Sequence, residues 1–401
     1  MTTLTSSAAA TGDRLPLAAL LALAMTGFIC IITETLPAGL LPQMAVGLGI
    51  STSLAGQTVT VYALGSLLAA IPLTIATQGW RRRNVLLLTI AGFLVFNSIT
   101  AFSSNYWLTL AARFLAGVSA GLAWSLLAGY ARRMVPTHQQ GRALAVAMVG
   151  TPVALSLGVP LGTWLGTAMG WRSAFALMSA LTVVLIVWVL AKVPDYPGQA
   201  SHERLPLRSV LTTPGVRPVL CVVIAWMLAH NILYTYVAPF VAQAGLDAHV
   251  DVVLLTFGIA ALVAIGITGR LVDHHLRATV LVSLATFASV SLLFVWLARV
   301  PAAIYVGVAV WGLTFGGAAT LLQTALADTA GDGADVALSM NVVAWNSAIA
   351  AGGLVGGVLL DVWGTASFPP VSCLLLAVGF VIAWMARPHG FKAGARHVPP
   401  Q

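Results

Sequence analysis

Charged side chains are scarce in this chain of 401 residues, because Asp, Glu, Lys and Arg together make up only 7% of it. Soluble globular proteins carry about 25% charged residues, so most of the surface of this chain cannot face water. Hydrophobic residues make up 59% of the chain, and its mean hydropathy is +0.96. The composition therefore excludes a soluble globular domain and predicts that lipid is the solvent for most of the residues.

Cysteine is also scarce, and the three cysteines, Cys30, Cys221 and Cys373, all lie in apolar segments. Their spacing excludes a cysteine metal site, so we expect them to be small apolar packing residues. The sequence also lacks a phosphate-binding loop, a nucleophile elbow, a zinc-binding H-E-x-x-H stretch and paired catalytic carboxylates. We therefore expect no enzyme activity, no bound cofactor or metal, and no direct coupling to ATP hydrolysis.

Twelve apolar runs are long enough to cross a hydrocarbon layer of ~30 Å, which takes about 20 helical residues. Lipid leaves no water to satisfy backbone polar groups, so each run must be a helix. The first run is longer than the ~7–15 apolar residues of a signal peptide, and we expect it to be retained as a span. The expected spans are residues 16–41, 54–78, 85–102, 106–130, 143–167, 173–193, 218–241, 251–272, 279–298, 302–327, 337–361 and 368–386.

Lys and Arg residues gather on one side of this pattern. Of the 19, fifteen lie in the even-numbered turns or in the two tails, and only Arg172 and Arg299 lie in the odd-numbered turns. Arg113 and Arg270 lie within spans. Basic loops stay in the cytoplasm, so we expect both termini to be cytoplasmic in a multi-pass protein of the cell inner membrane. Basic residues confined to short turns also argue against a nucleic-acid partner, despite the formal charge of +8.

The longest polar stretch divides the chain into two sets of six spans. The predicted organisation is a tail at 1–15, a six-helix bundle at 16–193, a linker at 194–217, a second bundle at 218–386 and a tail at 387–401. The halves echo each other in two tight basic turns. The turn after span two contains Gly79, Arg81 and Arg82, and the turn after span eight contains Gly269 and Asp273.

Glu34 is the only one of the 11 acidic residues that the sequence places deep in a span. A charge there costs at least ~2.5 kcal/mol, so the side chain should face an interior cavity. A buried carboxyl group can bind and release a proton near neutral pH. Arg113 of span four is expected at a similar depth, about 10 Å from the outer surface, and is the natural ion-pair partner. The alternatives are a permanently paired structural carboxylate and an arginine that only bonds backbone carbonyls.

Trp226, His230 and Tyr234 recur every four residues on span seven and therefore share one helix face. Rings with polar edges suit an amphipathic organic substrate. The alternative is a histidine that only packs between helices. Weaker candidates of the same kind are Trp311 and Phe315 on span ten, and Asn341 and Trp345 on span eleven.

Small residues recur at four-residue spacing on spans four and five. Gly117 and Gly121 lie on span four, and Gly158, Gly162 and Gly166 on span five, where they allow helices to approach closely. Pro160 lacks a backbone N–H group and can bend span five. Plain packing and a role in sliding contacts between helices both agree with this spacing.

Five stretches carry a resemblance to a known family. They are Thr33–Pro42 in span one, Arg113–Gly117 in span four, Gly158–Phe175 around span five, His230–Phe240 in span seven and Asn341–Gly357 in span eleven. The chain resembles the major facilitator superfamily over essentially its whole length. More narrowly, it resembles the twelve-span drug:proton antiporters of the arabinose-type and chloramphenicol-type efflux branch. The resemblance implies two six-helix bundles that alternately open a midplane site to either side.

One departure from the family pattern concerns the turn after span two. Its usual acidic position is Ala76 and its first glycine is Pro72, while the second-half copy keeps Gly269 and Asp273. A charge latch on the first-half acidic residue is therefore in doubt, and one on Asp273 remains possible.

The resulting expectation is a secondary active transporter, acting as a monomer, that exports small amphipathic organic compounds or antibiotics. The energy source would be the proton motive force, with Glu34, Arg113, His230 and Asp273 as candidate coupling residues. The alternatives are a sugar or metabolite exporter on the same scaffold, an uncoupled facilitator, and a non-transporting membrane sensor.

Overall fold

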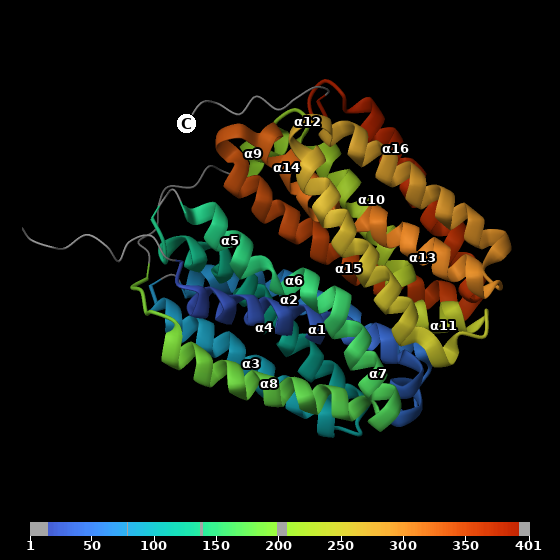
Figure 1. The fold of residues 1–401 in the computed structure, drawn as a ribbon, viewed down its shortest axis with the longest axis horizontal. Coiled ribbons are helices and arrows are strands. Elements are labelled where there is room, and N and C mark those ends of the chain that lie inside the picture. Colours follow the sequence, from blue (N-terminus) through green and yellow to red (C-terminus); the bar gives the residue numbers. More distant parts are fainter. Residues whose placement is uncertain (1–14, 78, 137–138, 199–206, 393–401) are drawn as a thin grey trace, which may run out of the picture.

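The computed structural model describes residues 15–77, 79–136, 139–198 and 207–392, whose regular structure is helical throughout (Figure 1). Twelve segments of these residues are long and apolar enough to cross a membrane. Every predicted span corresponds to one of them, which confirms the all-α polytopic fold. Most of the predicted tails at 1–15 and 387–401 lie outside the described residues.

The first half contains spans one to six, and span five is assembled from four short pieces. Its elements are α1 (Leu17–Leu48), α2 (Thr52–Ala76), α3 (Arg82–Phe102), α4 (Tyr106–Arg133), α5 (Gln140–Met148), α6 (Gly150–Val153), η2 (Ala154–Gly158), α7 (Val159–Met169) and α8 (Trp171–Lys192).

The second half contains spans seven to twelve after a short helix. Its elements are α9 (Leu207–Thr212), α10 (Val216–Thr235), α11 (Val237–Ala242), η3 (Asp247–His249), α12 (Val250–Leu297), α13 (Pro301–Phe315), α14 (Ala318–Ala330), η4 (Gly331–Gly333), α15 (Ala334–Trp363), η5 (Thr365–Ser367) and α16 (Phe368–Met385). Spans eight and nine are both part of α12, which has non-helical backbone angles at His275. The predicted turn after span eight is therefore a sharp bend rather than a loop.

The expected end of span one at residue 41 is wrong. The helix α1 continues past Pro37 and Pro42 to Leu48, where Gly49 caps it in the left-handed conformation with φ 66°. Proline removes one backbone bond but does not end a helix whose neighbours hold it in place. Because of this extension, Glu34 lies near the middle of α1 rather than close to its outer end.

The two sides of the molecule differ in charge, and we name them by that difference. The side with Arg81–Arg83, Arg132, Arg133, Lys192 and Arg387 at its helix ends is the basic side, and the other is the opposite side. In Figure 1 the helices of the two halves diverge toward the basic side, at the left, and converge toward the opposite side, at the right.

Glycines set the close helix contacts within the first half. A Cβ atom at Gly117 of α4 would collide with the carbonyl oxygen of Tyr62 on α2, and one at Gly121 with that of Ser66. The glycines of span five face large side chains of α1 in the same way. These contacts are Gly158 with Ile32, Gly162 with Leu36 and Gly166 with Leu40. The spacing read from the sequence therefore marks two helix–helix contacts.

Span five changes its helical type just before Pro160. Residues Ala154–Gly158 form a π-helical turn, and Pro160 lies buried in the first turn of α7. Proline has no N–H group for the regular bond to the fourth residue before it, and a widened turn accommodates that loss. The widened turn lies against the second half, because a Cβ atom at Gly258 of α12 would meet the backbone of Ser156.

Hydrogen bonds hold the residues that follow α8 against the first half on the basic side. Asp195 accepts hydrogen bonds from the Arg81 side chain and from the backbone N–H of Arg83, the latter at 3.2 Å. The Tyr130 hydroxyl donates to the Pro194 carbonyl at 2.6 Å, and the backbone N–H of Arg82 donates to the Tyr196 carbonyl at 2.9 Å. The predicted linker at 194–217 thus begins as a fixed segment, and its residues 199–206 lie outside the described part.

Candidate transport site

Glu34 lies near the middle of α1, deeper than the ~10 Å from the outer surface that the sequence analysis expected. Its side chain is partly exposed although α1 is packed between other helices, so it reaches open space inside the molecule. The adjacent Thr33 hydroxyl accepts a 2.9 Å hydrogen bond from Asn97 of α3. One turn earlier, the Cys30 carbonyl accepts a 2.9 Å bond from the Tyr62 hydroxyl of α2. These two bonds fix the register of α1 against its neighbours around the carboxyl group.

Arg113 is fully buried beside this segment and is held mainly by rings and carbonyls. Its guanidinium carbon lies 4.9 Å from the ring centroid of Tyr62 and 5.7 Å from that of Phe175. The Nε group donates to the Thr58 carbonyl at 3.3 Å, and Nη2 to the main-chain carbonyl of Glu34 at 3.4 Å. Cation–π contacts of this kind are worth ~2 kcal/mol or more when desolvated.

The expected ion pair between Arg113 and Glu34 is not formed in this structure. Within the described residues, the arginine contacts the main chain of Glu34 and not its carboxylate. The Arg113 Nη1 group is buried without a hydrogen-bond partner. A buried donor that lacks a partner costs about 1–3 kcal/mol, so a new hydrogen bond donated by this nitrogen would be stabilising.

Aromatic side chains of three helices converge on His230. Its ring lies parallel to that of Phe315 on α13, with 3.5 Å between centroids and 4° between planes. Tyr234 stacks on the His230 ring with 5.1 Å between centroids, and Trp311 approaches His230 edge-on at 5.3 Å. Phe257 of α12 completes the cluster at 5.7 Å from His230. The structure thus brings together His230, Tyr234, Trp311 and Phe315, as the sequence analysis expected of one site.

The other predicted cavity residues lie around this aromatic cluster. Trp345 of α15 is partly exposed and lies 6.5 Å from Phe315 between ring centroids. Trp226 and Asn341 are buried, the first with no exposed surface at all. Trp311, 2% exposed, stacks on Phe287 and so packs into the second half. Phe315 and Trp345 are therefore the members of the set that present the most surface to open space.

Several polar atoms of this cluster are buried without a hydrogen-bond partner among the described residues. They are Trp226 Nε1, His230 Nδ1, the Tyr234 hydroxyl, Trp311 Nε1 and Asn341 Oδ1. Native proteins leave few such atoms unpaired, and each one calls for a specific explanation. A polar ligand that supplies the missing partners is one such explanation.

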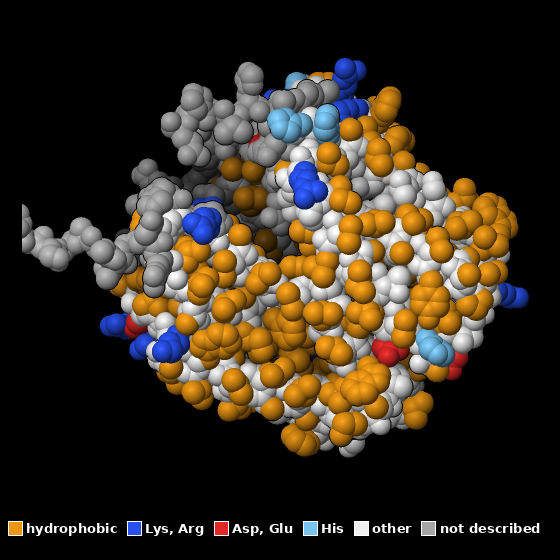
Figure 2. Space-filling view, viewed as in Figure 1, with side chains coloured by type: hydrophobic (Ala, Val, Ile, Leu, Met, Phe, Trp, Pro, Cys, Tyr) orange, Lys and Arg blue, Asp and Glu red, His pale blue; other side chains and the backbone are white. Residues whose placement is uncertain are grey.

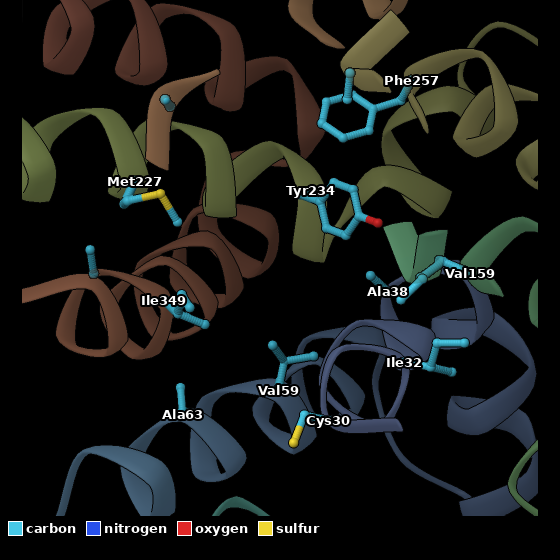
Figure 3. Close-up of a cluster of buried hydrophobic side chains, with 14 of the residues drawn as sticks. Cys30, Ile32, Ala38, Val59, Ala63, Val159, Met227, Tyr234, Phe257 and Ile349 are labelled. Carbon is cyan, nitrogen blue, oxygen red and sulfur yellow. The ribbon is translucent and has the colours of Figure 1, made fainter. Parts of the chain in front are cut away.

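Tyr234 lies at the boundary between the halves. Figure 3 shows its hydroxyl directed away from Phe257 and toward Ala38 of α1 and Val159 of α7 in the first half. Ala38 follows Glu34 by four residues on α1, so the two share one face of that helix. The aromatic second half and the charged first half therefore enclose one site near the middle of the molecule.

The boundary between the halves opens on the basic side. Figure 2 shows a recess between the two halves, bordered by Lys and Arg side chains at its rim and by hydrophobic side chains deeper in. This recess agrees with the divergence of the helices toward the basic side in Figure 1.

On the opposite side the halves are joined by hydrogen bonds. Ser53 Oγ of α2 donates to Asp361 Oδ2 of α15 at 2.7 Å. Gln57 Nε2 of α2 donates to the Gly353 carbonyl of α15 at 3.3 Å. The Tyr236 hydroxyl donates to the Gly353 carbonyl at 2.7 Å and lies 3.4 Å from the Ser53 carbonyl. The structure is thus closed on the opposite side and open on the basic side.

Four residues in these contacts were not singled out by the sequence analysis. Tyr62 and Phe175 flank Arg113, and Phe257 completes the aromatic cluster, but nothing in their sequence context separates them from other aromatic residues of apolar spans. The fourth is Asp361, whose contact with Ser53 spans 308 positions in the chain. Only a three-dimensional arrangement reveals such pairs.

The conformational residues predicted in the two basic turns have different surroundings. Gly79 and Gly269 have no atoms near the position of a Cβ, whereas Arg82 is buried and donates to the Thr77 carbonyl at 3.1 Å. The backbone of Asp273 lies two residues before the bend at His275, and its side chain is outside the described part. The described residues contain no group of three or more His, Cys, Asp or Glu side chains that could hold a metal ion.

Comparison with known proteins agrees with this architecture. The family model of the Major Facilitator Superfamily matches residues 23–352. The purine ribonucleoside efflux pump NepI of Salmonella enteritidis is 30% identical over 367 residues, which cover 89% of this chain and 91% of that protein. NepI of Salmonella paratyphi B is 29% identical over the same length.

A solved structure shows the same fold at lower sequence similarity. The human organic anion transporter MFSD10 superposes with a TM-score of 0.65 at 18% identity, over 92% of this chain and 97% of that one. The match in fold, the family model and the relatives over nine-tenths of the chain agree. The chain belongs to the Major Facilitator Superfamily and is a multi-pass membrane transporter rather than an enzyme.

Proposed function

We propose that this transporter exports small, flat organic compounds from the cytoplasm in exchange for protons. The observation that carries the proposal is the meeting of two chemically different surfaces at the midplane. Glu34 and Arg113 lie on the first half, and the aromatic cluster around His230 lies on the second half. A carboxylate deep in a membrane protein is costly unless it has a function.

The aromatic cluster supports a substrate with a flat ring. The rings of His230 and Phe315 already stack in parallel, and Trp345 lies tilted beside Phe315. Offset aromatic stacking contributes about 0.5–1.5 kcal/mol per pair beyond the burial of area. The unpartnered Tyr234 hydroxyl and the unpartnered indole and imidazole nitrogens offer hydrogen bonds to polar atoms on the ring.

Purine ribonucleosides are the first candidates within this class. The relatives named as purine ribonucleoside efflux pumps share 29–30% identity with this chain, and a purine is a flat ring system with donors and acceptors on its edge. Antibiotics and other amphipathic drugs also belong to the proposed class of substrates. Their export would make the cell resistant to them.

The coupling step follows from the position of Glu34. In the structure, open on the basic side, the carboxyl group is partly exposed, and Arg113 Nη1 is free to pair with it. We propose that a proton entering from the opposite side neutralises Glu34 and releases the substrate outward, and that the proton leaves on the basic side after the reverse movement. We take the basic side as cytoplasmic, with both termini there. Each proton that moves inward down 100 mV supplies ~2.3 kcal/mol.

Transport assays in proteoliposomes test this proposal. Purified protein is reconstituted, an inward or outward pH gradient is imposed, and accumulation of tritiated inosine is followed with and without a protonophore. We expect accumulation only with the gradient, and its loss with the protonophore. Inosine uptake that does not depend on the pH gradient would instead indicate an uncoupled facilitator.

A panel of other compounds decides the substrate class. Arabinose, chloramphenicol and a purine base are each added to the same assay at equal concentration, and the accumulation of tritiated inosine is measured. We expect the flat-ring compounds to compete with inosine and arabinose not to compete. Competition by arabinose alone would favour the sugar exporter and contradict the role assigned to the aromatic cluster.

A further inference from the structure

A cavity lies between the halves on the opposite side of the molecule. It has a volume of about 510 Å³, within the ~300–1,000 Å³ of pockets that hold small molecules. Its walls come from both halves: Gln43, Gly47 and Trp171 of the first, and Ala238, Asp247 and Val250 of the second. We call this cavity the vestibule.

Two polar atoms of vestibule residues lack hydrogen-bond partners although they are buried. They are Trp171 Nε1, a donor, and Gln43 Oε1, an acceptor. Trp171 is only 4% exposed, and the other end of the Gln43 amide donates to the Thr167 hydroxyl at 3.4 Å. The described residues thus place one donor and one acceptor at the same cavity, and both lack the partner that buried polar groups normally have.

The indole nitrogen is held in place by its surroundings. The Arg172 guanidinium lies 4.3 Å from the centroid of the Trp171 ring and donates to the carbonyls of Gly47 and Ser103, at 3.3 and 2.9 Å. The absence of a side chain at Gly47 leaves room for Trp171 Nε1, which a Cβ atom there would contact at 2.5 Å. The donor is therefore part of a rigid wall.

The vestibule is separate from the central site but close to it along α1. Gly39 lies at its inner end, against Thr163 and Leu254, and Glu34 lies five residues further in. At a rise of 1.5 Å per residue this is about 7.5 Å along the helix. A compound that leaves the central site toward the opposite side reaches the vestibule next.

We propose that the vestibule is an exit subsite, where the exported compound binds a second time before it leaves the protein. This inference rests on the proposed function and deepens it. The ligand class is a small, uncharged organic molecule with a hydrogen-bond acceptor and a donor on one edge, as in a lactam or an amide. The acceptor receives the Trp171 N–H and the donor bonds Gln43 Oε1.

The charges around the vestibule exclude an anionic ligand. Asp247 contributes a carboxylate to the lining and is exposed. Arg172, which lies over the indole ring, is not among the lining residues, and its Nη2 group donates to main-chain carbonyls. No cationic side chain among the lining residues is therefore free to pair with an anion.

Equilibrium binding of tritiated inosine to the purified full-length protein tests this inference. The vestibule and the residues of the central site are present in the same arrangement of the halves, so the wild type should bind two molecules per chain at saturation. Gln43→Leu and Trp171→Phe each remove one polar atom, and Gly47→Ala places a methyl group against the indole nitrogen. Each variant should bind one molecule per chain, half the wild-type amount.

Matched controls separate this effect from general damage. Trp363→Phe changes an exposed tryptophan on the same side, and Gly266→Ala changes a glycine with no neighbour near its Cβ position. Both should keep two bound molecules. Phe315→Ala, in the central site, should also leave one molecule bound, namely the one in the vestibule.

The outcomes distinguish this inference from the function on which it rests. One molecule per wild-type chain, lost in Phe315→Ala and kept in the three vestibule variants, would refute the exit subsite and leave the proposed function intact. Absence of inosine binding to the wild type would refute both, since both assign this class of compound. The one molecule that vestibule variants retain shows that they are folded.

Discussion

The hydroxyl of Ser53 on α2 donates a 2.7 Å hydrogen bond to Asp361 Oδ2 on α15, so one side chain from each half meets at the opposite side of the transporter. One turn deeper, Gln57 of α2 donates to the Gly353 carbonyl of the second half, and the Tyr236 hydroxyl of the second half lies 3.4 Å from the Ser53 carbonyl of the first. This set of contacts must separate when the site opens to the opposite side, because it ties the halves together where they converge.

A disulfide in place of the Ser53–Asp361 bond should therefore stop transport. In Ser53→Cys/Asp361→Cys, oxidation is expected to hold the opposite side closed and abolish proteoliposome transport, and a reducing agent is expected to restore it. Each single cysteine variant serves as the control for the native Cys30, Cys221 and Cys373. Full transport by a quantitatively cross-linked protein would show that these ends do not separate.

Gly117 should tolerate no larger side chain, because its missing Cβ leaves room for the backbone of α2. A Cβ atom there would overlap the Tyr62 carbonyl oxygen, which cannot move without shifting the helix. We expect Gly117→Val to destabilise the protein by about 1–3 kcal/mol or to prevent folding. Gly129→Val, on the same helix but with no neighbour near its Cβ position, is the matched control. Thermal unfolding of the detergent-purified proteins measures the difference, and equal melting temperatures would disprove the close contact.

Asp195 should stabilise the basic side only while it is charged. Partial burial raises the pKa of this carboxyl group, but the hydrogen bonds from Arg81 and Arg83 and their charges outweigh burial and lower its pKa below the ordinary value. The contribution of Asp195 to the free energy of unfolding is therefore complete above the ordinary carboxyl pKa. It is lost as the pH falls through the lowered pKa of the folded protein. Asp195→Asn should cost less than about 1 kcal/mol at neutral pH, because Arg81 is largely exposed.

A double-mutant cycle measures this link. Arg81→Gln, Asp195→Asn and the double variant are compared by thermal unfolding at neutral pH and at acid pH. We expect the two changes to be non-additive at neutral pH and additive at acid pH. Additive effects at both values would mean that the contact contributes nothing to stability.

Much of the fold was accessible from the sequence because lipid imposes simple rules. A span must be helical and about 20 residues long, so hydropathy alone located all twelve segments. The end of span one was missed, because α1 stays helical through Pro42 to Leu48. The break at His275 lies within the turn predicted after span eight, but the sequence did not show that the chain bends there without a loop.

The site was predictable in composition but not in its contacts. The rarity of a carboxylate within a span singled out Glu34, and the four-residue spacing placed His230 and Tyr234 on one face. The sequence carried no signal for the rings that flank Arg113 or for the route by which its guanidinium reaches main-chain carbonyls. Those contacts depend on how α2, α4 and α8 pack, which no local pattern encodes.

The central claim is that Glu34 carries the proton that drives export. Glu34→Gln keeps the size of the side chain and mimics its neutral form at every pH, so the variant should fold and still bind inosine. It should lose accumulation driven by a pH gradient, while Glu34→Asp should retain part of it with a shifted pH optimum because the carboxyl group has a shorter reach.

The most direct measurement is accumulation of tritiated inosine in proteoliposomes with and without an imposed pH gradient, for the wild type and Glu34→Gln side by side. We expect the gradient to raise accumulation in the wild type and to leave it unchanged in Glu34→Gln, which exchanges inosine passively at best. If Glu34→Gln concentrates inosine against its gradient as well as the wild type does, Glu34 is not the coupling residue.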